Sequence, residues 1–142
     1  MFKILEKYKN TGSFDFYQSD SLSKVCNAPT DKSGVYIVWN ATDQKDMKLL
    51  YIGRSGKKEN GVIVHRKAGL GGIKDRLVNG HQFGKNPRKR IWPDIMVKNN
   101  ISRLHIEWYN TEEDDPVEIE RELISEVLKI RGFLPEWNNQ PY

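Results

Sequence analysis

The chain has 142 residues, which suits one domain and leaves little room for two. Its four Trp, six Tyr and five Phe supply core material, which argues against a chain disordered throughout. Lys and Arg number 23 against 19 Asp and Glu, and this small positive excess permits nucleic-acid binding without requiring it. The single cysteine, Cys26, excludes an internal disulfide and a cysteine-rich zinc site.

Residues 1–33 are mixed and rich in turn-forming residues, so we expect an N-terminal extension rather than part of the core. The first ten residues, MFKILEKYKN, contain no long apolar run. Neither a signal peptide nor a membrane helix is therefore expected, and a reducing, cytoplasmic compartment is the default.

A β-hairpin is predicted next. The segment GVYIVWN at 34–40 and the segment KLLYIG at 48–53 are rich in strand-forming residues, and the turn ATDQKD separates them. Residues 54–72 form a basic, glycine-rich loop in which VIVH has the composition of a short strand.

Two short helices and a third strand follow. Residues 73–79 predict a helix that ends at Gly80, and residues 85–100 predict a second one. At 102–110, apolar and polar residues alternate, as in a strand with one buried face.

The strongest helix signal begins after Asp115, which suits the N-cap, with Pro116 at the first helical position and Gly132 at the C-terminal stop. The order of elements predicts an α+β fold in which helices flank a small, mainly antiparallel, three-stranded sheet. We expect a single domain over residues 1–142 with its core at about 34–138.

One carboxylate in this last helix is predicted to lie on the apolar side that faces the core. At about 100° per residue, Glu120 falls near the middle of an apolar arc made by Ile119, Leu123, Ile124, Val127, Leu128 and Ile130. A carboxylate facing a core is costly unless it is paired or binds a cation. Two interpretations remain open: a structural salt bridge, for example to an arginine, or a metal ligand at the floor of a site.

The predicted hairpin carries two tyrosines at matching places. Tyr36 closes the triplet GVY, and Tyr51 opens the triplet YIG. Either tyrosine alone is more often a packing residue. Together, G-V-Y, a turn and Y-I-G resemble the signature of the GIY-YIG nuclease superfamily, with Val35 in place of the first isoleucine.

Further positions of that family can be matched one at a time. Arg76 stands where the family has an arginine on the first helix after YIG. The family has a His or Tyr one turn later, where this chain has Gly80, with His81 one residue beyond. Arg54 stands where the family often has a lysine. Because arginine keeps its proton, Arg54 would bind phosphate and cannot act as a base.

Two family positions near the C-terminus also match. The family has a glutamate a few residues before a Leu-Ile pair, and Glu120 fits, which is the residue that the helical arc had already identified. The family closes with an asparagine after a proline, and Asn138 follows Pro135. The resemblance covers about residues 34–138.

The resemblance implies an endonuclease that hydrolyses DNA phosphodiester bonds with one Mg²⁺ or Mn²⁺. Glu120 would hold the metal ion and Arg76 would bind the phosphate. Tyr36 or Tyr51 would accept a proton from the attacking water, helped by a cationic neighbour such as His81, and the sequence does not say which tyrosine acts. Asn138 would fix the glutamate helix or a phosphate.

Outside these motifs, a basic cluster lies beside Trp92 and consists of Lys85, Arg88, Lys89 and Arg90. It suits either a solvated surface or contacts to the DNA backbone. A homodimer or a separate targeting partner would be compatible with a domain of this size. The alternatives are a catalytically degenerate GIY-YIG fold that only binds nucleic acid, and an interaction domain whose tyrosines are structural.

Overall fold

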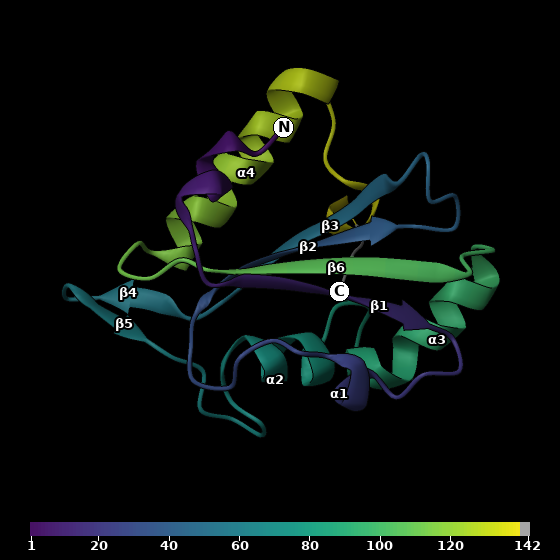
Figure 1. Ribbon diagram of the computed structural model, residues 1–142, viewed down its shortest axis with the longest axis horizontal. Coiled ribbons are helices and arrows are strands. Elements are labelled where there is room, and N and C mark those ends of the chain that lie inside the picture. The colour runs from purple at the N-terminus through teal and green to yellow at the C-terminus, as the bar shows by residue number, and fades with distance from the viewer. Residues whose placement is uncertain (140–142) are drawn as a thin grey trace.

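A four-stranded antiparallel sheet forms the centre of the computed structural model, which describes residues 1–139 (Figure 1). The predicted hairpin is confirmed as β2 (Gly34–Asn40) and β3 (Lys48–Ser55). Tyr36 lies opposite Gly53 in its register. Residues 35–38 are all buried, because both faces of this strand pair are covered.

The predicted third strand is also present, as β6 (Arg103–Asn110). Its side chains alternate between half-buried and buried, and it pairs with β2 along its full length. The expected α+β class, with helices flanking a small antiparallel sheet, is therefore confirmed.

The sheet has one strand more than the three expected. Residues Thr11–Tyr17 form β1, which pairs with β6 and completes the order β1-β6-β2-β3. Phe14 and Phe16 point into the core from β1. The segment 1–33 is thus an integral part of the sheet and of the core.

Helices cover the sheet on both faces (Figure 1). One face carries α4 (Pro116–Arg131) and the 3-10 helix η1 (Lys3–Lys7), which pack on Val35, Ile37 and Ile52. The other face carries the helices α1 (Leu22–Val25), α2 (Gly72–Asn79) and α3 (Arg88–Lys98). Tyr36, Val38 and Tyr51 face this second layer. A last 3-10 helix, η2 (Glu136–Asn139), lies against β3.

The sequence signals for α4 act as expected. The Asp115 side chain accepts a hydrogen bond from the Val117 amide, and Gly132 ends the helix with φ at 79°. The buried arc is narrower than expected, because Leu128 and Ile130 are exposed near the end of the helix. No helix among residues 1–139 is long and apolar enough to cross a membrane.

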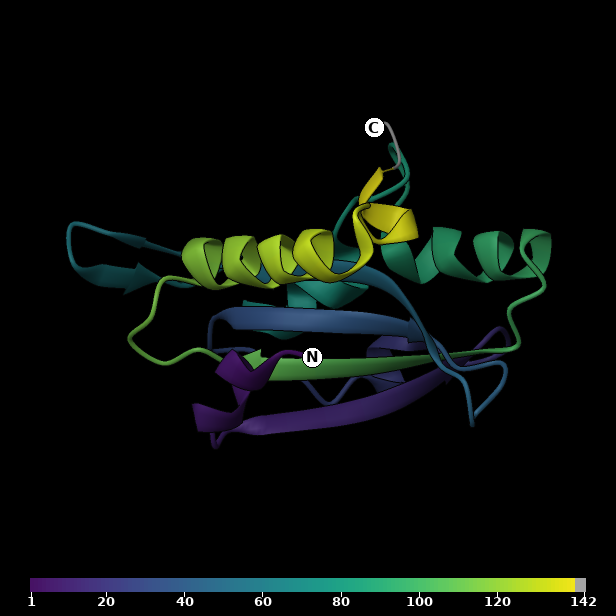
Figure 2. The same cartoon turned by 90° about the horizontal axis from the view of Figure 1, so that it is seen from above.

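The basic segment after β3 contains a second, smaller hairpin. Its strands are β4 (Lys57–Glu59) and β5 (Val62–Val64), joined through Asn60 and Gly61 at positive φ. The Lys58 amide donates to Asp115 at the N-terminus of α4. This hairpin extends beyond the main sheet in both views (Figures 1 and 2).

Candidate functional site

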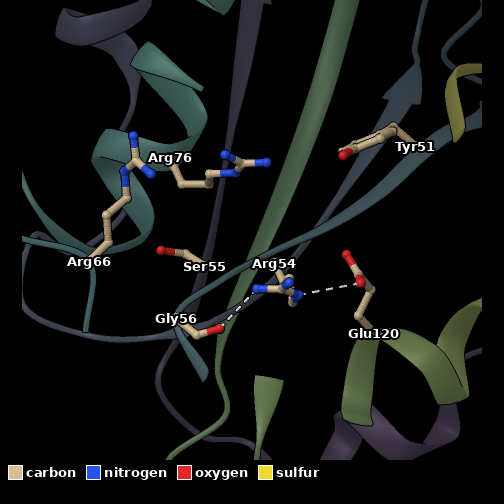
Figure 3. A pocket seen from close by; sticks show the side chains of 7 residues that line it. All are labelled: Tyr51, Arg54, Ser55, Gly56, Arg66, Arg76 and Glu120. Atoms are coloured by element: carbon tan, nitrogen blue, oxygen red, sulfur yellow. Dashed lines mark hydrogen bonds and ion pairs between the residues drawn. The ribbon is translucent and has the colours of Figure 1, made fainter. Parts of the chain in front are cut away.

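A cavity of about 240 Å³ opens where β3, α2 and α4 meet (Figure 3). Strand β3 provides Tyr51 and Arg54, α2 provides Arg76, and α4 provides Glu120. The full lining is Tyr51, Arg54, Ser55, Gly56, Arg66, Arg76 and Glu120. In Figure 3, the hydroxyl of Tyr51 and the guanidinium of Arg76 point toward one another across the opening.

Four of the residues selected from the sequence therefore line one cavity: Tyr51, Arg54, Arg76 and Glu120. They come from three different elements that are separated along the chain. The sequence singled out neither Ser55 nor Arg66, which both lie in the basic, glycine-rich segment 54–72. The cavity lining is mainly cationic, since it contains three arginines and one glutamate.

Glu120 forms a salt bridge to an arginine, as one of the two interpretations of its place in the helix expected. Its carboxylate pairs with Arg54 Nε at 3.6 Å, and its side chain keeps 25% of its surface exposed within the cavity. Burial raises the pKa of Glu120 above its usual value, while Arg54, Arg76 and Arg121 act against that rise. No hydrogen bond to this carboxylate is recorded within residues 1–139. The carboxylate therefore already faces one cation, Arg54, and its exposed part lies in the cavity.

Arg66 is held in the cavity wall by a buried carboxylate. Its Nε donates to Asp75 Oδ2 at 2.6 Å, and Asp75 is only 1% exposed. Burial alone would raise the pKa of Asp75, but hydrogen bonds from Asn79, Arg66 and the Leu70 amide lower it on balance. Asp75 therefore fixes the loop that delivers Arg66 to the cavity.

The two tyrosines of the signature occupy different environments. Tyr51 lines the cavity, whereas Tyr36 is fully buried beneath it, with ring centres 6.1 Å apart. The Tyr36 hydroxyl has no hydrogen-bond partner among residues 1–139. Of the two, Tyr51 is thus the one that can reach a molecule in the cavity.

Two expected site residues lie outside the cavity. His81 is exposed and forms an isolated β-bridge with Pro87, because α2 has already ended at Asn79. The Asn138 side chain accepts from the Ile52 amide and donates to the Ile52 carbonyl, each at 3.0 Å. It therefore fixes η2 to β3 and is not among the residues that line the cavity.

The basic cluster at 85–90 is divided by the fold. Lys85, Lys89 and Arg90 are exposed, as a contact to DNA would require. Arg88 is fully buried, so its expected role as a surface phosphate contact is wrong. Since it is the first residue of α3, its side chain points back toward α2 and the core.

Neither a cluster of metal ligands in the described part of the chain nor a known relative identifies the site. Within residues 1–139, no cluster of three or more His, Cys, Asp or Glu side chains could enclose a metal ion by itself. No protein-family model, no curated protein and no solved structure matches the chain. The case for a function is therefore made by the side chains in the cavity.

Proposed function

We propose that this chain is a divalent-metal-dependent endonuclease that hydrolyses DNA phosphodiester bonds with a GIY-YIG-type site. One observation carries the proposal. Tyr51, Arg76 and Glu120, selected from three separate segments because they match one family's pattern, line a single cavity. Arg54, which the same pattern selected, lies beside Glu120.

The donor set suits one hard cation of the Mg²⁺ class. Glu120 is the one carboxylate lining the cavity, and its oxygens accept no recorded hydrogen bond among the described residues. Mg²⁺ is often held by one or two carboxylates and keeps several waters. Bound there, Mg²⁺ or Mn²⁺ would neutralise charge on a phosphate and activate water.

The arginines in the cavity suit an anionic substrate such as a phosphodiester. Arg54, Arg66 and Arg76 carry three positive charges against the two negative charges of Glu120 and of Asp75, which pairs with Arg66, and this excess suits a phosphodiester anion. Arg76 would bind the phosphate oxygens and stabilise the charge that grows on them. Tyr51, in its anionic form, would accept the proton of the attacking water.

Contacts beyond the cleaved phosphate would come from the exposed cations Lys85, Lys89 and Arg90. The proposal is compatible with a cytoplasmic enzyme that acts as a homodimer or with a targeting partner.

A second function is favoured by one contact. The pair between Arg54 and Glu120 partly satisfies the carboxylate that the cleavage chemistry needs. A cavity with three arginines and an engaged glutamate could bind a nucleic-acid phosphate without cutting it. Under this alternative, DNA binding needs no metal ion and survives the loss of Glu120.

Cleavage of supercoiled plasmid tests the proposal. With Mg²⁺ or Mn²⁺, the wild type and Glu122→Ala, a change on the exposed face of α4, should nick or linearise the plasmid. EDTA and Glu120→Ala should each stop the reaction. Equal cleavage by Glu120→Ala would point to another site or to a contaminant. DNA binding without cleavage by the wild type would favour the second function.

The two tyrosines should differ in their effect on the rate. Tyr51→Phe is expected to slow single-turnover cleavage by about a hundredfold, within the range for loss of a general base. Tyr36→Phe should change the rate less than about threefold, because the hydroxyl it removes is buried and has no hydrogen-bond partner in the described chain. Similar losses in both variants would contradict the assignment of the base to Tyr51.

A further inference from the structure

Arg88 is a buried positive charge that no carboxylate within residues 1–139 balances. Its side chain is fully buried at the start of α3. None of the ion pairs recorded within residues 1–139 includes it. Arginine is almost never fully buried unless it is paired, because removing its charge from water is costly. The free-energy cost of burying this charge suggests that Arg88 has a role beyond packing.

The contacts of Arg88 lead to the candidate site. Its Nη1 donates to the main-chain carbonyl of Arg76 at 2.6 Å. Its guanidinium carbon lies 5.4 Å from the ring centre of Tyr36 and 5.3 Å from that of Tyr51. Nη2 is buried without a hydrogen-bond partner among the described residues. One side chain thus joins α2 to both tyrosines.

Gly80, which follows α2, leaves room for this guanidinium. A Cβ atom on Gly80 would lie 2.4 Å from Arg88 Nη1 and 2.2 Å from the Arg76 carbonyl oxygen. Any side chain at position 80 would therefore displace Arg88 or distort the last turn of α2. Glycine leaves the space beside Arg76 free, and α3 fills it with a cation.

We propose that Arg88 is a positioning residue for the cavity. Its side chain holds the C-terminal turn of α2, and with it Arg76, against Tyr51. This inference rests on the proposed nuclease function, because it assigns Arg88 a part in that same reaction. Arg88 itself lies beneath the cavity and does not line it.

The hydrogen bonds around Arg88 allow a clean test. In Arg88→Met, the Arg76 carbonyl keeps its bond from the Gly80 amide at 3.0 Å. The Gln82 Oε1 atom, which accepts from Arg88 Nε at 2.9 Å, keeps its bond from Trp92 Nε1 at 3.2 Å. No acceptor is orphaned, and replacing a buried charge with an apolar side chain is often neutral or stabilising. Arg88→Met should therefore fold.

The experiment compares Arg88→Met, Arg88→Lys and Lys98→Met, an exposed control on the same helix, by single-turnover plasmid cleavage, DNA affinity in EDTA and thermal unfolding. Arg88→Met is expected to slow cleavage tenfold to a hundredfold, the scale of a small misplacement of catalytic groups. Its DNA affinity should stay within about threefold of wild type, and its melting temperature should be equal or higher. Arg88→Lys, which keeps the charge, should be closer to wild type. In a Tyr51→Phe background, Arg88→Met should slow cleavage by a smaller factor than in the wild type.

Three results would overturn the inference. Wild-type cleavage by a folded Arg88→Met variant would show that the charge has no part in the reaction. An Arg88→Met variant that loses stability and activity together, with no rescue by Arg88→Lys, would show a packing role alone. If the wild type cleaves no DNA, the proposed function itself fails, and the role of Arg88 in it fails too.

Discussion

Replacing Glu120 with glutamine is expected to lower the cleavage rate about a thousandfold and, at neutral pH, to raise the melting temperature. The loss of rate follows because glutamine cannot hold the divalent cation, whose charge stabilisation is worth several kcal/mol. The gain in stability follows because burial raises the pKa of Glu120, so its ionised form is disfavoured in the folded protein.

The pH dependence of this gain has a definite sign. A carboxyl whose pKa is higher in the folded state than in the unfolded chain stabilises the fold when it is protonated. That stability is fully present below about pH 4.3, the ordinary value for glutamate, and is lost as the pH rises through the folded value. Glu120→Gln should therefore exceed wild type at pH 7 and match it near pH 3.5.

Thermal unfolding of both proteins across this pH range measures the effect, with Glu118→Gln as the exposed control on α4. Adding Mg²⁺ or Mn²⁺ at ten times its dissociation constant should raise the free energy of unfolding of the wild type by about 1.4 kcal/mol, and with it the melting temperature, and should leave Glu120→Gln unchanged. A variant that is less stable than wild type at pH 7 would mean that the pairing with Arg54 outweighs the cost of burial.

Gly53→Ala is expected to destabilise the protein by about 3 kcal/mol, at the upper end for an overpacked core. Gly53 is the glycine of YIG and lies opposite Tyr36 in the strand pairing. A Cβ atom there would lie 2.5 Å from Tyr36 Cζ and 2.6 Å from Tyr51 Cε2. Tyr36 is enclosed on all sides and cannot move away. This glycine thus lets the two tyrosine rings lie over the backbone of β3.

Denaturant unfolding measures the loss, and a second background tests its cause. The same substitution should cost less in a Tyr36→Leu protein, because the ring atoms that it meets are then absent. Gly61→Asn serves as the control, since Gly61 lies in open space and asparagine tolerates its positive φ. An equal cost of Gly53→Ala in both backgrounds would exclude the ring contact as the cause.

Local signals predicted much of the fold. The ends of α4 are set by Asp115 and Gly132, each of which acts through its own side chain or backbone angle. Short stretches of sequence also predicted the β2–β3 hairpin and the alternation of buried and half-buried residues in β6. The placement of Glu120 followed from helical geometry, and the cavity around it agrees with that reading.

Long-range packing explains what the sequence did not predict. Strand β1 has short polar residues around Phe14 and Phe16, and its partner β6 lies far along the chain. Arg88 belongs to a run of cations and differs from Lys89 only in the direction that α3 gives it. His81 lies outside the cavity because α2 ends one residue before Gly80. Each outcome depends on partners that no local pattern specifies.

The contact between Asn138 and Ile52 also occupies the hydrogen-bonding groups of one residue at the open edge of the sheet. Strand β3 is an edge strand, and unpaired amide and carbonyl groups at such an edge can template pairing with a second molecule. The Asn138 side-chain amide matches both groups of Ile52, as the main chain of another strand would. Because Ile52 lies between Tyr51 and Gly53, this one side chain occupies the strand edge beside the tyrosine that lines the cavity.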